Sequence, residues 1–106
     1  MRPSEHAMQA HYPLTFEREM GCTSDELRAW LPGASRGRLI EWRKDAAVVS
    51  IDEGHATLSW QTLEPRRIAL ITLPRLRVRM EALGVDEPAW QRFMKHFDLY
   101  TQRGGG

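Results

Sequence analysis

The segment that most constrains the fold is Arg66–Met80, which reads RRIALITLPRLRVRM. Its second half alternates strictly between basic and apolar side chains: Arg75, Arg77 and Arg79 on one face, Leu76, Val78 and Met80 on the other. Period-two alternation is typical of a strand with one buried and one solvated face. Pro74 interrupts the segment and cannot donate a hydrogen bond to a neighbouring strand. We therefore expect residues 66–82 to form one long strand kinked at Pro74; the other arrangement is two strands joined at Leu73-Pro74.

Four shorter segments show the same alternation of apolar and polar side chains. They cover residues 12–19, 38–44, 46–52 and 55–63. Turn signals follow three of them, at Lys44-Asp45, Asp52–His55 and Glu64-Pro65. Because these connections are far too short for parallel crossovers, the sequence predicts an antiparallel meander.

Two segments show helical periodicity. Thr23 or Ser24 can cap a short helix that carries an apolar stripe and that Pro32-Gly33 is expected to stop. Asp86 can cap a longer helix that reaches residue 100. Its apolar side chains recur at i, i+3, i+4 and i+7: Trp90, Phe93, Met94 and Phe97. We expect this second helix to cover the apolar face of the sheet.

The predicted fold is a single α+β domain in the order β-α-β-β-β-β-α. It has one five-stranded antiparallel sheet with a short and a long helix on one face. This order resembles one repeat of the TATA-binding-protein-like topology and, more loosely, a shortened helix-grip domain. The analogy concerns element order alone and implies no function. We expect a flexible arm over residues 1–10, the domain over 11–100, and a flexible glycine-rich tail over 101–106.

Composition narrows the class of protein. At 106 residues, with 42% hydrophobic and 27% charged residues, the chain suits one globular domain. A net charge of +1 does not favour nucleic-acid binding. No apolar run reaches the roughly 20 residues of a membrane helix, and the N-terminus has no apolar core of signal-peptide length. The single cysteine, Cys22, excludes an internal disulfide and fits a reducing compartment. We therefore expect a cytoplasmic protein.

The candidate binding site is the polar face of the predicted sheet. It brings together three arginines and three uncharged polar residues: Arg75, Arg77, Arg79, Thr57, Ser59 and Gln61. Guanidinium, hydroxyl and amide groups can hold phosphates or an acidic partner segment. Alternatively, acids on outward parities neutralise the arginines across the strands: Glu17, Glu19, Glu41 and Asp52. All four tryptophans fall on apolar parities, which argues against base stacking and nucleic acid.

Apolar residues also occur on outward parities, at Val48, Ala69, Ile71 and Leu73. Such a patch is typical of an interface, and we expect a homodimer or another protein partner. We find no catalytic motif, no histidine pair at metal-ligand spacing and no cofactor fingerprint, so no catalytic residue, metal or cofactor is predicted. The sequence favours a non-catalytic binding or assembly module. The alternative is a small enzyme or a phosphate or nucleotide binder, with a pocket between the sheet and the C-terminal helix.

Overall fold

The computed structural model describes residues 11–102 and confirms the predicted order of elements. The elements are β1 (Thr15–Met20), α2 (Ser24–Ala34), β2 (Ile40–Arg43), β3 (Ala46–Ile51), β4 (Gly54–Ile68), β5 (Ile71–Leu83) and α3 (Glu87–Gln102). The predicted arm and residues 103–106 of the predicted tail lie outside the described residues. Helix α3 continues through Gln102, beyond the expected domain boundary at residue 100.

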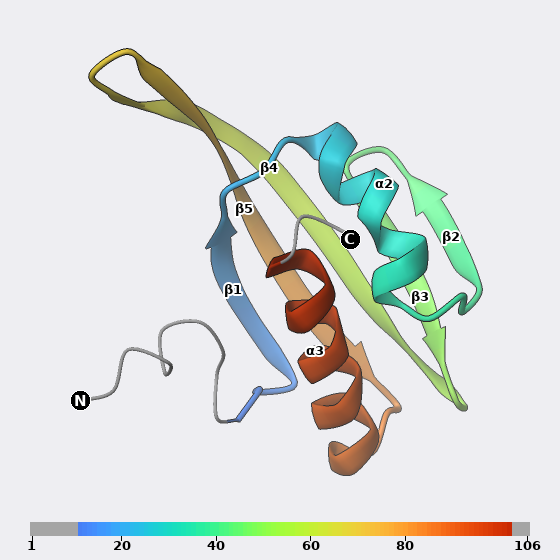
Figure 1. Cartoon of the computed structure of the whole chain (residues 1–106). Coiled ribbons are helices and arrows are strands. Elements are labelled where there is room, and N and C mark those ends of the chain that lie inside the picture. The colour runs from blue at the N-terminus through green and yellow to red at the C-terminus, as the bar shows by residue number, and fades with distance from the viewer. Residues whose placement is uncertain (1–10, 103–106) are drawn as a thin grey trace.

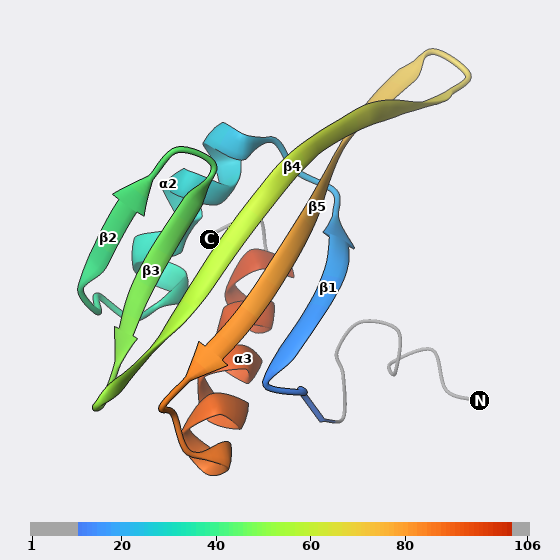
Figure 2. The ribbon, with the colours of Figure 1, turned by 180° about the vertical axis from the view of Figure 1, so that it is seen from behind.

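The five strands form one antiparallel sheet in the order β1-β5-β4-β3-β2. Helices α2 and α3 lie on the same face of this sheet, and the opposite face is open (Figures 1 and 2). The hydrophobic core lies between the sheet and the two helices, and both layers contribute side chains to it. Its fully buried side chains include Leu27, Leu31, Val49, Leu58, Leu76, Val78, Met80, Trp90, Met94 and Phe97. The predicted α+β fold with both helices on the apolar face is therefore confirmed.

The long hairpin of β4 and β5 differs from both predicted arrangements. Its turn lies at Ala69-Leu70, where Ile68 pairs with Ile71, so Arg66 and Arg67 belong to β4. Pairing shifts between Leu63 and Arg66, which places Glu64-Pro65 opposite Pro74 in a bulge. A proline cannot donate to a ladder, and both prolines sit where the ladder is already interrupted. The turn itself has no glycine, and Ala69 adopts a φ of 55°.

Helix α2 passes through Pro32-Gly33, so the prediction that it stops there is wrong. Pro32 lies in the last turn, and its missing N–H costs the helix one hydrogen bond without ending it. Gly33 has a different role, because a Cβ atom there would lie 2.2 Å from the Tyr100 hydroxyl oxygen. Glycine at this position leaves room for the end of the Tyr100 side chain of α3 to pack against α2.

A buried carboxylate, Asp98, ties α3 to the N-terminal part of the described chain. It accepts hydrogen bonds from Arg18 at 2.5 and 3.1 Å and from the Tyr12 hydroxyl at 2.5 Å. Nearby, the Gln91 amide bonds both the N–H and the carbonyl oxygen of Tyr12. These contacts fix the edge strand β1 and the residues before it against the last helix.

Candidate functional site

The open face of the sheet carries the predicted binding residues. Strand register places Arg79 between Glu17 of β1 and Ser59 of β4. In the same way, Arg77 lies between Glu19 and Gln61. Arg75 lies opposite Leu63, and Thr57 lies opposite Glu81. The arginines thus share a face with the three polar side chains of β4.

Acidic side chains of β1 neutralise most of this arginine ladder. Glu19 accepts hydrogen bonds from Arg75 at 2.7 and 3.1 Å, and Glu17 lies 3.7 Å from Arg79. The hydrogen bonds from Arg75 and the nearby positive charges hold the pKa of Glu19 below its ordinary value. Arg77 forms no hydrogen bond or salt bridge with another described residue. It borders a shallow hollow of about 210 Å³ with Glu17, Ser59 and Gln61.

The other two predicted acids do not join the ladder. Glu41 pairs with Arg43 in its own strand at 3.0 Å, and Asp52 lies in the β3–β4 turn.

The residues of the predicted outward apolar patch do not form one surface but lie in two separate places. Val48 lies beside Thr57 in the body of the sheet, whereas Ile71 and Leu73 lie near the hairpin turn.

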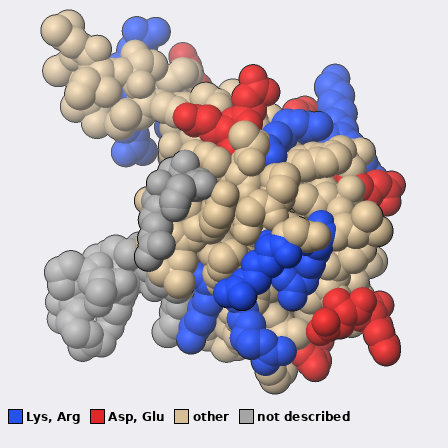
Figure 3. Space-filling model, turned by 45° about the vertical axis from the view of Figure 1, so that its right-hand side comes forward, with Lys and Arg blue, Asp and Glu red and all other residues tan. Residues whose placement is uncertain are grey.

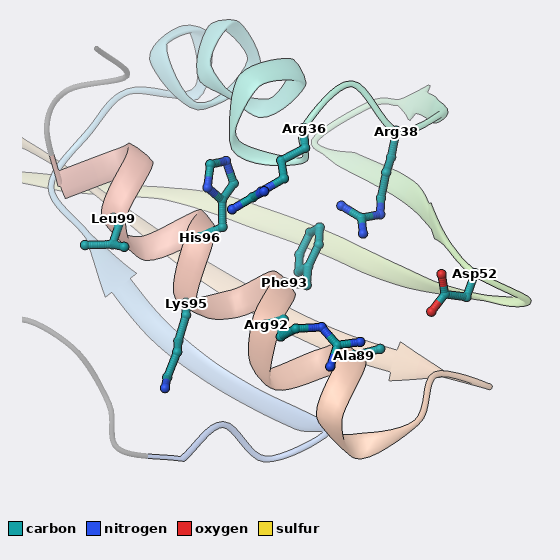
Figure 4. Close-up of a pocket in the computed structure, with 9 residues that line it drawn as sticks. All are labelled: Arg36, Arg38, Asp52, Ala89, Arg92, Phe93, Lys95, His96 and Leu99. Carbon is teal, nitrogen blue, oxygen red and sulfur yellow. The ribbon is translucent and has the colours of Figure 1, made fainter.

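A second site, which we call the α3 pocket, lies between α3, the α2–β2 loop and the β3–β4 turn (Figure 4). It has a volume of about 350 Å³. The residues that line it are Arg36, Arg38, Asp52, Ala89, Arg92, Phe93, Lys95, His96 and Leu99. Four of these carry permanent positive charges and one is acidic, so the pocket is strongly basic.

The α3 pocket contains one histidine, His96. His96 is half-buried, and its Nε2 atom lies 3.1 Å from the Gly33 carbonyl oxygen. Because a carbonyl can only accept, we assign the proton to Nε2. The sequence did contain one signal for this pocket. Arg92, Lys95 and His96 share a helix face at i, i+3 and i+4.

The thiol of Cys22 is buried just before α2. Burial, followed by the charge of Glu26, raises its pKa to about 11. A raised pKa keeps the thiol protonated at neutral pH, so Cys22 is a poor candidate for a nucleophile.

We expect alkylation of Cys22 by iodoacetamide at pH 8 to be about 100-fold slower than that of a free thiol, because a thiol with a pKa of about 11 has a correspondingly smaller thiolate fraction at that pH. Mass spectrometry over a time course measures this rate. Denaturant should restore the rate of a free thiol. Rapid labelling of the folded protein would contradict the burial of this side chain.

Within residues 11–102, no group of three or more histidine, cysteine or acidic residues is placed to hold a metal ion. No helix in that range is long and apolar enough to cross a membrane. No protein-family model matches the chain, and a search of curated proteins finds no match either.

Proposed function

We propose that this protein is a non-catalytic, cytoplasmic assembly module that forms a homodimer through the end of its β4–β5 hairpin. We call residues 66–73 the hairpin tip. Neighbouring strands support only the body of this hairpin, since β3 pairs with β4 up to Ser59 and β1 pairs with β5 from Leu76. The Trp60 N–H still bonds the Asp45 carbonyl, but beyond Trp60 and Leu76 no other described strand pairs with either edge. The tip stands clear of the rest of the described molecule (Figures 1 and 2).

The single observation that carries the proposal is the apolar surface of this tip. Leu70 is fully exposed, and Ile68, Ile71 and Leu73 are exposed to 52%, 59% and 42%. Figure 3 shows the tip at the upper left as largely uncharged surface flanked by basic side chains. Burying one large aliphatic side chain stabilises an interface by about 1.5–3 kcal/mol. Contiguous aliphatic side chains on a hairpin whose outer edges lack a neighbouring strand are typical of a contact surface.

A second copy of the chain is the partner that best fits the tip. Two unpaired strand edges allow antiparallel pairing of two tips about a twofold axis, so that the same surface serves both subunits. Glu64 at the base of the tip and Arg67 nearer its end carry opposite charges. Opposite charges meet in an antiparallel register that sets Glu64 of each copy against Arg67 of the other. Because the contact is small, we expect a dissociation constant on the order of micromolar.

Sedimentation equilibrium at several concentrations tests this proposal. We expect the wild-type chain to show a concentration-dependent dimer and a Leu70→Asp, Ile71→Asp variant to remain monomeric. Its melting temperature at low concentration should be unchanged, because both side chains are exposed. The control is Leu39→Asp, since Leu39 is also exposed but lies in the α2–β2 loop. A wild-type chain that stays monomeric at its highest soluble concentration, or equal effects of both changes, would overturn the proposal.

A further inference from the structure

The α3 pocket contains a concentration of positive charge that the described part of the chain does not neutralise. Arg36, Arg92 and Lys95 form no salt bridge with any residue in the range 11–102. The open face differs, because there Glu19 of β1 pairs with Arg75 and Glu17 of β1 pairs with Arg79. Like charges held together in a concave site repel one another unless an anion binds between them.

The backbone presents these cations in fixed positions. After α2, the chain turns sharply through Arg36 and Gly37, whose φ angles are 58° and 75°. Both N–H groups bond back to the last turn of the helix, at 3.0 Å to Gly33 and 2.9 Å to Pro32. Arg38 follows, and its guanidinium donates to the Ser35 carbonyl and lies 5.8 Å from the centre of the Phe93 ring. A side chain held in this way loses little conformational entropy when a ligand binds.

The side chains converge on a common space. Figure 4 shows Arg38 from the loop, Arg92 from α3 and Asp52 from the β3–β4 turn directed toward the region around Phe93. Arg36 extends toward His96, whereas Lys95 points away. The ring of Phe93 is almost completely buried and provides an apolar floor. Guanidinium groups bind phosphate through paired hydrogen bonds, and the single carboxylate can accept hydrogen bonds from ligand hydroxyl groups.

We infer that the α3 pocket binds a small organic phosphate that carries hydroxyl groups. The phosphate lies among Arg36, Arg38 and Arg92, and a hydroxyl donates to Asp52. The carbon skeleton of the ligand packs on Phe93. A volume of about 350 Å³ is sufficient for a ligand of sugar-phosphate size. This site lies on the helix side of the molecule and is independent of the hairpin tip and of the proposed dimer.

Isothermal titration calorimetry of the full chain with ribose 5-phosphate and with inorganic phosphate, at low ionic strength, tests the inference. We expect both to bind, with the sugar phosphate tighter. Arg36→Gln and Arg92→Gln should each weaken both ligands about tenfold or more, because each removes charge-assisted hydrogen bonds. Neither arginine has a salt bridge to another described residue, so both variants should fold. The matched control is Arg77→Gln on the open face, which should bind as the wild type does.

The Asp52→Asn variant distinguishes binding of the sugar phosphate from binding of inorganic phosphate. Asp52 has a φ of 53°, a conformation that asparagine tolerates, so the turn should be retained. We expect this variant to lose affinity for ribose 5-phosphate but not for inorganic phosphate. Failure of either ligand to bind would overturn the inference. So would an equal loss in the Arg77→Gln control, or tighter binding of an oligonucleotide that depends on Arg77, because both would indicate a general polyanion surface.

Discussion

Replacement of Asp98 by alanine is expected to lower the free energy of unfolding by about 3–5 kcal/mol, the range for breaking a buried ion pair from one side. The Asp98 carboxylate is almost fully buried and receives hydrogen bonds from Arg18 and Tyr12. Its loss removes a buried carboxylate that the largely buried Arg18 guanidinium contacts at 2.5 Å. Urea denaturation followed by circular dichroism measures the change.

Two further variants assign the origin of that loss. Asp98→Asn keeps an oxygen that can accept from Tyr12 but removes the charge, so we expect a smaller loss than with alanine. Combining Asp98→Ala with Arg18→Met should destabilise by less than the sum of the single changes, because both charges are then absent. A loss below about 1 kcal/mol for Asp98→Ala would show that this ion pair does not hold β1 to α3.

The second large effect is expected from Phe97, which is fully buried between α3 and the sheet. Phe97→Ala should lower the free energy of unfolding by about 3–5 kcal/mol, because it removes a large buried side chain and leaves a cavity. The Phe97 ring also lies 6.4 Å from that of Phe93, in a nearly parallel arrangement that alanine cannot reproduce. The same urea denaturation experiment measures this change.

Leu99→Ala is the matched control for Phe97→Ala. Leu99 lies in the same helix but is 45% exposed, so its truncation should cost about 1 kcal/mol or less. Similar losses for the two variants would indicate that α3 is not docked on the sheet through the face that carries Phe97.

Hydrophobic periodicity was sufficient to predict the order of elements. The period-two pattern of Arg75–Met80 and the helical spacing of Trp90, Phe93 and Phe97 both depend on which side faces the core, and burial confirms each. The end of the hairpin could not be predicted in the same way. A proline is compatible with a turn or with a bulge, so Glu64-Pro65 did not distinguish the two. The actual turn, Ala69-Leu70, carries none of the residues that mark turns.

The α3 pocket was harder to predict because three separate segments form it. Arg36 and Arg38 come from one loop, Asp52 from another turn, and Arg92 from the last helix. Only tertiary packing brings these residues together, and their sequence spacing has no regular period. The open face was easier, since strand alternation alone places Arg77 and Gln61 on the same side.

The position of β1 in the sheet has a consequence for how the chain folds. Every other neighbouring pair joins consecutive strands, whereas β1 pairs with β5, and its contact of Met20 with Leu76 spans 56 residues. Closing so long a loop costs more conformational entropy than forming a hairpin. During synthesis β1 emerges from the ribosome first, yet its partner strand emerges only after the other three strands. The first strand in the described part of the chain must therefore wait for its partner strand until most of the protein has been made.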